Sequence, residues 1–279
     1  PLVAGKQTVV RVHLKVLDGK GDVPGVHGYV YYPYSGYGPI FSPINAGGVM
    51  TARGGPDRGV LDHTLNFTIP GAYATCSGLL FVRVLPPEGV TFSAIDELQE
   101  SRWLSFGSVP AMRLRLVGMN YTINGVTYTP RNVDYANVQS WFRSAYPTGN
   151  LISSWTTATF TQSTDLPNCC TVDQQLATIK ALDIINKTAT SDTRYYGLVF
   201  EGPPDFHFMV GCVCAFGTTS GPTGADTWGW DTDGSYGDWY TGHEIGHQHG
   251  LCHPGACGAQ EGQPDTSPHC ATYPYPKGL

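Results

Sequence analysis

Eleven residues toward the end of the sequence carry side chains that could bind a metal ion and use it. They are His243-Glu244-Ile245-Gly246-His247-Gln248-His249-Gly250-Leu251-Cys252-His253. On an α-helix, residues four apart lie on one face, so the imidazoles of His243 and His247 can converge on one metal ion. Glu244 follows one step round the helix, where its carboxylate can reach a metal-bound water. The spacing therefore predicts a metal site with its own general base.

Gly250 and His253 complete the predicted site. Glycine can take a backbone angle that other residues avoid, so at Gly250 the helix can end and the chain can turn back. His253 would then reach the metal from outside the helix. Three histidine nitrogens leave the fourth position of a tetrahedral zinc ion open for water, which is typical of catalytic zinc sites. His249 lies about 240° round the helix from His243, and we expect it to point away from the metal.

The spacing H-E-x-x-H-x-x-G-x-x-H is that of the metzincin metalloproteases, and every specified position matches in this sequence. A histidine-rich surface turn, or a buried helix with satisfied histidines, would explain the histidines but not the full pattern. Residues 230–240 before the motif and 273–276 after it resemble a group of secreted metzincin-like zinc proteases with a β-rich domain ahead of the catalytic one. The resemblance covers the chain from about residue 110 onward, and the N-terminal part only loosely.

The resemblance implies a role for each matching residue. His243, His247 and His253 would bind Zn²⁺, which would lower the pKa of a bound water toward about 7 and polarise the scissile carbonyl. Glu244 would take the proton from this water and pass it to the leaving amine. We therefore expect a secreted zinc-dependent endopeptidase that hydrolyses peptide bonds by zinc-bound water.

One departure from the family lies after the third histidine. Metzincins carry a Met-containing turn beneath the zinc, downstream of that histidine, but the last methionine of this sequence is Met209. Either the floor of the site is built differently, or the turn lies on a further stretch of chain. We expect the second: that this chain is the N-terminal part of a longer catalytic unit, whose remainder is a C-terminal fragment of the same precursor.

The loop before the predicted zinc helix is rich in glycine and aspartate. Asp231, Asp233 and Asp238 could hold a calcium ion, because hard oxygen ligands on a Gly-rich loop suit that metal. Their spacing is not that of an EF-hand, so we favour a turn-rich loop in which the aspartates bond to nearby backbone N–H groups. We expect Asp238 to be the N-cap of the zinc helix, because a capping box of Thr241 with Glu244 would occupy the carboxylate that the chemistry needs.

The composition restricts the kind of partner. Only 14% of the 279 residues are charged and the formal net charge is −6, which argues against nucleic acid or an anionic membrane. No apolar run approaches the ~20 residues that a membrane span needs. The expected partners are a protein or peptide substrate and, for the N-terminal part, an extracellular matrix or cell-wall component.

Eight cysteines and three N-x-[ST] sequons indicate the secretory route and an extracellular location. An intracellular protein whose cysteines bind metal is the alternative. The sequons predict glycosylation at Asn66, Asn120 and Asn186. Cys76 is the only cysteine before Cys169. If every cysteine pairs within this chain, Cys76 must therefore form a disulfide with the C-terminal part.

Residues 1–90 show a strand period and no helical period. Alternation of apolar and polar residues predicts strands at about 9–17, 27–32, 61–69 and 78–85. In the third of these, the pattern places Asn66 on the solvent face. We therefore predict a small antiparallel, Ig-like β-sandwich over residues 1–90. A connector would follow at 91–109, with a short helix around 96–103.

From residue 110 the pattern changes to alternating strands and helices. Strands are expected at about 112–116, 195–201 and 207–216, and helices at about 134–146 and 171–187. Thr171 and Gln174 form a capping box for the second helix. The pattern predicts an α/β (α+β) metzincin-like catalytic domain at 110–279, whose last helix carries the zinc ligands.

Two other functions fit the sequence. The chain could be a non-catalytic extracellular structural or matrix module that retains a zinc site. It could also be a metal-dependent hydrolase of another bond, such as an amide in a small molecule. Zinc content, together with cleavage of an unfolded protein with and without a chelator, separates these functions from an endopeptidase.

Overall fold

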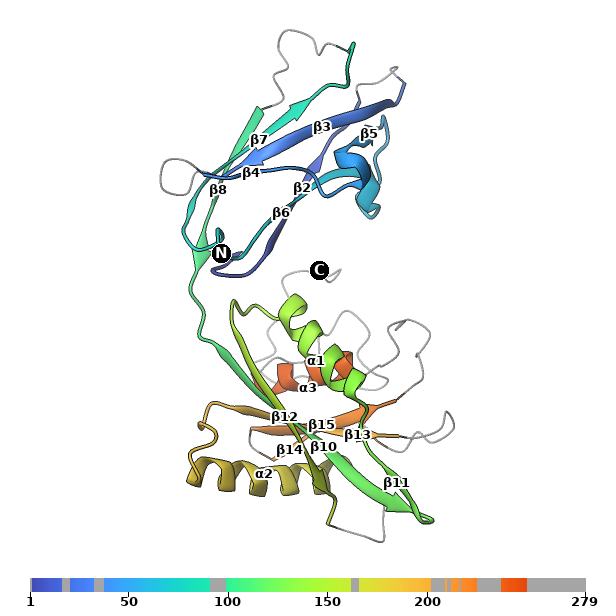
Figure 1. Ribbon diagram of the computed structural model, residues 1–279, viewed down its shortest axis with the longest axis vertical. Coiled ribbons are helices and arrows are strands. Elements are labelled where there is room, and N and C mark those ends of the chain that lie inside the picture. The colour runs from blue at the N-terminus through green and yellow to red at the C-terminus, as the bar shows by residue number, and fades with distance from the viewer. Residues whose placement is uncertain are drawn as a thin grey trace, which may run out of the picture. The chain divides into compact units, whose positions relative to one another are not determined.

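The protein consists of two compact units (Figure 1). The computed structural model describes residues 2–16, 21–32, 38–90, 99–161, 166–201, 209, 212–215, 217–224 and 237–249, with the backbone alone at 212–215. Unit 1 comprises Pro1–Ala111 with Pro147–Asn150, and unit 2 comprises Met112–Tyr146 with Leu151–Leu279. The division lies close to residue 110, where the sequence pattern changes.

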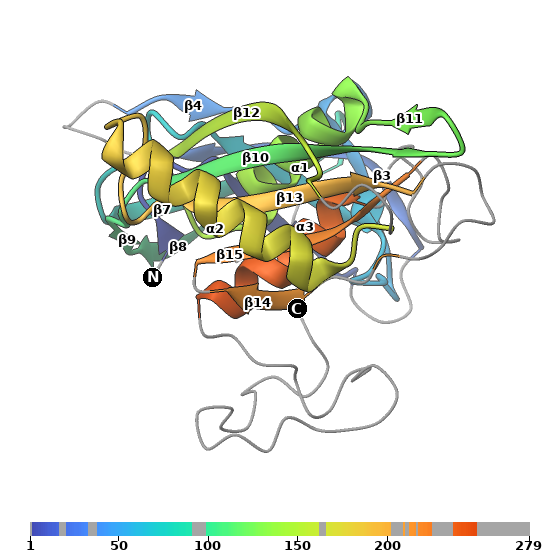
Figure 2. The same ribbon diagram turned by 90° about the horizontal axis from the view of Figure 1, so that it is seen from below.

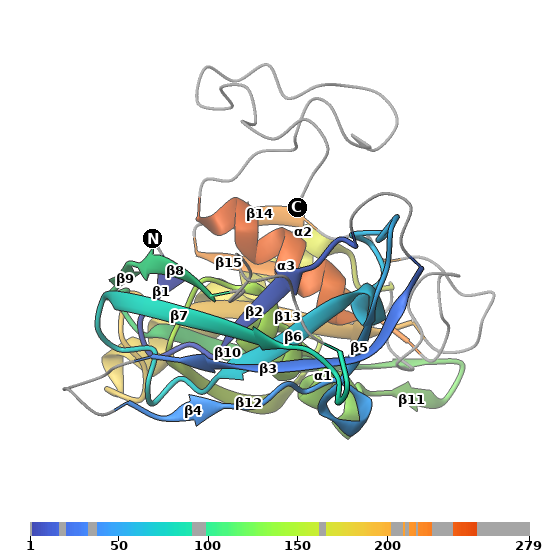
Figure 3. The same cartoon turned by 90° about the horizontal axis from the view of Figure 1, so that it is seen from above.

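Unit 1 is built from β-strands. They are β1 (Leu2–Val3), β2 (Thr8–His13), β3 (Val23–Tyr31), β4 (Ile40–Phe41), β5 (Met50–Ala52), β6 (Thr64–Ile69), β7 (Gly78–Leu85), β8 (Gln99–Leu104) and β9 (Phe106–Gly107), with short 3-10 helices at Ala46–Gly48 and Leu61–His63. The largest sheet has the order β4-β3-β7-β8, and β5 also pairs with β3. Figure 3 shows β3 and β7, the antiparallel pair at its centre. β2 pairs with β6, and β1 pairs with β9.

The side chains of these strands alternate between one core and the solvent, as a period of two requires. In β7, Leu80, Val82 and Val84 are buried while Phe81 and Arg83 are only half-buried. The buried residues of β3, β6 and β7 belong to one hydrophobic cluster. Unit 1 is therefore β-rich, as expected, and its assignment to an Ig-like sandwich stays a prediction.

Three expectations for unit 1 are wrong. Residues 99–107 are not a connector or a helix, because β8 is antiparallel to β7 and β9 pairs with β1. Asn66 does not face solvent: it is only 6% exposed, and its amide hydrogen-bonds to Leu61 and Thr64. Cys76 is an exposed free thiol, whereas it was expected from the sequence to be disulfide-bonded.

Unit 2 contains a mixed sheet and three helices in its described residues. The elements are β10 (Met112–Ile123), β11 (Val126–Tyr128), α1 (Asn132–Ala145), β12 (Leu151–Thr159), α2 (Cys169–Ile185), β13 (Arg194–Phe200), β14 (Cys212–Ala215), β15 (Thr218–Thr223) and α3 (Gly237–Gln248). β12, β10, β13 and β15 lie side by side and parallel, β14 is antiparallel beside β15, and β11 forms a hairpin with β10. This is an α/β arrangement, as expected in outline.

The helices of unit 2 cover both faces of its sheet (Figures 1 and 2). α1 and α3 lie together on one face, where Leu114, Val138 and Ile245 belong to one buried cluster. α2 lies on the other face, where Val172 and Leu176 pack with alternate residues of the same strands. The sheet therefore provides a rigid support beneath α3, the helix that carries the predicted zinc ligands.

Two local predictions for unit 2 need correction. α2 begins at Cys169, and its N-cap is Asn168, whose side chain accepts a hydrogen bond from the Thr171 backbone N–H at 3.1 Å. The expected capping box starting at Thr171 is therefore wrong, because the helix is already under way there. β12 was not expected from the sequence, although it pairs with β10 along its whole length.

Candidate metal centre

Close packing against α1 fixes the position of α3. Gly242 faces Trp141 of α1, and a Cβ at this position would collide with the Trp141 ring. The Tyr146 hydroxyl donates a hydrogen bond of 2.7 Å to the Gly242 carbonyl. On the side of the sheet, Ile245 is fully buried, and the Gln248 amide donates a 2.7 Å hydrogen bond to the Thr219 hydroxyl. The helix is therefore anchored on two sides near the histidines.

His243 and His247 converge as their helical spacing predicts. Their Nε2 atoms lie 3.1 Å apart, and their rings meet edge to face with centroids separated by 4.7 Å. Two nitrogens bound to one tetrahedral zinc ion at about 2.0–2.1 Å would lie roughly 3.3 Å apart. The two imidazoles are therefore already at the separation that a shared metal ion requires.

Trp239 supports the first of these rings. Trp239 is one turn before His243 on α3, and their rings stack with centroids 5.6 Å apart and planes inclined by 24°. Such stacking restricts the rotation of the imidazole, so that its Nε2 stays directed toward His247. Trp239 was not among the residues singled out from the sequence, although the four-residue interval was visible there.

Glu244 lies between the two histidines in sequence and is only 5% exposed. Burial, and then the negative charge of Asp173, raise the pKa of Glu244 to about 7. Tyr196 is fully buried near Glu244. Burial, and then the Glu244 carboxylate, raise the pKa of Tyr196. Glu244 can therefore gain or lose a proton near neutral pH, which is the property a general base or acid needs.

Asp173 and Tyr196 were not identified from the sequence as residues of the site. Asp173 lies in α2 and Tyr196 in β13, and neither is close to the zinc motif along the chain. They act on Glu244 because the fold brings three elements together, and no local pattern signals that. The residues that set the proton affinity of Glu244 are therefore visible only in three dimensions.

Several predicted site residues fall outside the described part of the chain. They are Gly250, His253, Asp231 and Asp233. Within the described residues, no group of three or more His, Cys, Asp or Glu side chains could hold a metal ion. The third zinc ligand and the calcium site therefore stay predictions.

Asp238 lies inside the first turn of α3, where its carboxylate accepts a 2.7 Å hydrogen bond from the Trp239 N–H. Its expected position as N-cap is therefore wrong.

The three sequons occupy different environments. Asn186 is exposed at the end of α2, and Asn120 is half-buried in β10. The buried Asn66 amide donates hydrogen bonds of 2.9 and 3.0 Å to the carbonyls of Leu61 and Thr64. A glycan would replace one of the two hydrogens on that nitrogen, so both bonds could not be kept. The 6% exposure of Asn66 also argues against a glycan at this position in the folded form.

A comparison of this chain with protein-family models, with curated proteins and with solved structures found no match. Among the helices of the described residues, none is both long enough and apolar enough to cross a membrane. Cys169 and Cys170, at the start of α2, are both disulfide-bonded. The chemistry of α3 is thus the main guide to function.

Proposed function

We propose that the protein is a secreted zinc-dependent endopeptidase of the metzincin type. His243, His247 and His253 are the zinc ligands and Glu244 is the general base. The observation that carries the proposal is the 3.1 Å separation of the His243 and His247 Nε2 atoms, with Glu244 buried on the same helix. Because the histidine pair is held by packing on the sheet and on α1, little rearrangement is needed to bind a metal.

Bound zinc would act as a Lewis acid that polarises the scissile carbonyl and makes water more acidic. Glu244 takes the proton that water loses as its oxygen attacks the carbonyl carbon. It then gives this proton to the nitrogen as the C–N bond breaks, so that an amine leaves and the carboxyl group of the other product forms. A positive charge held by the histidine pair would favour the ionised form of Glu244, which is the form a base requires.

The stacked Trp239 and the buried Glu244 have supporting roles in this proposal. Trp239 keeps the His243 ring in the orientation that binds metal. The low exposure of Glu244 keeps bulk water away from its carboxylate, which strengthens its electrostatic effect on the reacting groups. The disulfide-bonded Cys169 and Cys170 support the extracellular location, because disulfides persist in oxidising compartments.

The proposal is tested by measuring zinc in the purified protein and its cleavage of reduced, carboxymethylated casein. The expected result is bound zinc, cleavage at internal peptide bonds, inhibition by 1,10-phenanthroline and recovery after zinc is restored. Tightly bound zinc with no cleavage of unfolded protein would favour a structural module. Zinc-dependent hydrolysis of small amides alone would assign the site to another hydrolase.

A further inference from the structure

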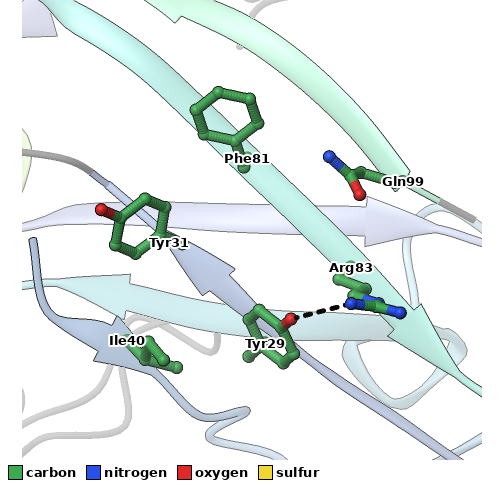
Figure 4. A pocket seen from close by; sticks show the side chains of 6 residues that line it. All are labelled: Tyr29, Tyr31, Ile40, Phe81, Arg83 and Gln99. Atoms are coloured by element: carbon green, nitrogen blue, oxygen red, sulfur yellow. Dashed lines mark hydrogen bonds between the residues drawn. The ribbon is translucent and has the colours of Figure 1, made fainter.

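Unit 1 carries an aromatic hollow on the outer face of its largest sheet. Its volume is about 310 Å³, and six residues from four strands line it: Tyr29, Tyr31, Ile40, Phe81, Arg83 and Gln99. Figure 4 shows these side chains standing on β3, β4, β7 and β8. The hollow lies on the opposite side of the sheet from the unit's hydrophobic cluster, to which Val30 and Val82 belong. These aromatic residues are therefore not needed to fill the core.

The strand register arranges the lining residues in two parallel rows. Ile40 pairs with Tyr31, and Tyr31 pairs with Phe81, which gives an apolar row across three strands. The Tyr31 and Phe81 rings lie side by side, with centroids 6.2 Å apart. This row is open to solvent, since Ile40 is 64% exposed and both rings are only partly buried. The face continues along β8 to Trp103, which pairs with Leu79 and is 68% exposed.

The second row is polar. Tyr29 pairs with Arg83, and Arg83 pairs with Gln99. The Arg83 guanidinium donates a long hydrogen bond of 3.5 Å to the Tyr29 hydroxyl, drawn as a dashed line in Figure 4. This row presents a hydroxyl, an amide and one cation within reach of a ligand lying on the rings. Arg83 is the only ionisable group, apart from the tyrosines, among the described residues that line the hollow.

A ligand that matches both rows has an apolar face and a polar edge. A sugar ring in a polysaccharide has this form, because its C–H groups can lie on an aromatic ring while its hydroxyls hydrogen-bond outward. Aromatic side chains with polar tips suit surfaces where one side of the ligand is apolar and the other is wet. The open shape also suits a chain that extends past the hollow toward Trp103.

We propose that this face of unit 1 binds a neutral polysaccharide, with Tyr31 and Phe81 stacking on sugar rings and Tyr29, Arg83 and Gln99 bonding to hydroxyls. Unit 1 is formally neutral, with eight Lys and Arg residues against eight Asp and Glu, so it offers no general attraction for a polyanionic chain. An added peptide strand would pair with a sheet edge rather than a sheet face. A protein partner would cover about 800 Å² per side with an apolar centre, whereas here a polar row runs directly beside the apolar one.

The test is native affinity electrophoresis in gels that contain β-glucan, arabinoxylan, galactomannan or, as a charged comparison, pectate. We expect slower migration in at least one of the three neutral polysaccharides. Tyr31→Ala and Phe81→Ala should each weaken this binding by on the order of tenfold, whereas Tyr31→Phe should retain it. Tyr73→Ala is the matched control, because Tyr73 is an exposed ring of the same unit outside the hollow.

Gln99→Ala keeps the test decisive if an alanine in place of a ring unfolds unit 1. Gln99 is exposed in the polar row, so its loss should weaken binding without changing the circular dichroism. No retardation in any neutral gel, retardation in pectate alone, or binding unchanged in the folded ring variants would overturn the proposal. A concentration-dependent dimer that Phe81→Ala abolishes would assign the face to a second copy of the chain instead.

Discussion

His243 and His247 differ from the third histidine of this helical segment in what they contact. Their Nε2 atoms are 3.1 Å apart, whereas His249 lies beside Tyr146, with ring centroids 6.1 Å apart. We therefore predict that His247→Ala lowers zinc affinity more than about 100-fold, because it removes a direct ligand. Equilibrium competition with a chromogenic zinc chelator measures this change.

His249→Ala is the matched control for the zinc measurement. It removes an imidazole from the same segment and should leave zinc affinity within a few-fold of the original value. If both variants lost the same amount of zinc affinity, metal binding would depend on the number of histidines in the segment and not on the His243 and His247 pair. Thermal unfolding of both zinc-free variants would show whether the substitutions disturb the fold itself.

The residue-level part of the site was predictable only where it was local. His243, Glu244 and His247 are placed by the geometry of one helix, and their relative positions follow from residue spacing. The proximity of Asp173 to Glu244 depends on how α2, the sheet and α3 assemble, so the sequence contained no sign of it. The same holds for Asn66, whose strand alternation suggested solvent but whose neighbours bury it.

At the level of elements, the zinc helix depends on a close approach to α1. An added methyl group at Gly242 would collide with the Trp141 ring. Gly242→Ala should therefore destabilise unit 2 by about 1–2 kcal/mol, because overpacking outweighs the gain of up to about 1 kcal/mol in helix propensity. Urea unfolding followed by circular dichroism measures the difference.

The Trp141→Leu background provides the control for this prediction. With the large ring removed, Gly242→Ala should be neutral or stabilising, since only the propensity term remains. A destabilisation of the same size in both backgrounds would mean that the collision with Trp141 is not its cause. In that case the interaction energy between Gly242→Ala and Trp141→Leu is close to zero, and α1 does not position α3 through this contact.

Strong periodic patterns predicted elements well, and polar strands were missed. β7 matches the expected range of 78–85, because alternating apolar residues precede Pro86-Pro87, which ends the strand. Almost every residue of β8 is exposed, so its sequence lacks the alternation of apolar and polar residues by which a strand is recognised. β12 is rich in Ser and Thr for the same reason: several of its side chains face solvent. Strands of this kind are recognised only by their hydrogen-bonding partners.

At the scale of the whole chain, the cysteines give a clear test. The structure has Cys76 as an exposed free thiol, while Cys169 and Cys170 are disulfide-bonded. N-ethylmaleimide added to the native protein without reductant should therefore label Cys76, and Cys76→Ser should remove that label and leave the melting temperature unchanged. Mass spectrometry of peptides locates the modification. A disulfide-linked peptide that contains Cys76 would contradict the structure.

The most direct test of the proposed chemistry is the rate of casein cleavage by Glu244→Gln at a zinc content equal to that of the unchanged protein. The substitution keeps the size of the side chain, but the amide that replaces the carboxylate cannot accept the proton from water. We predict that the rate falls by on the order of 10² to 10⁴, with zinc still bound, because general base catalysis typically contributes that much. Cleavage by the zinc-loaded variant at the original rate would contradict the role of Glu244 and with it the proposed mechanism.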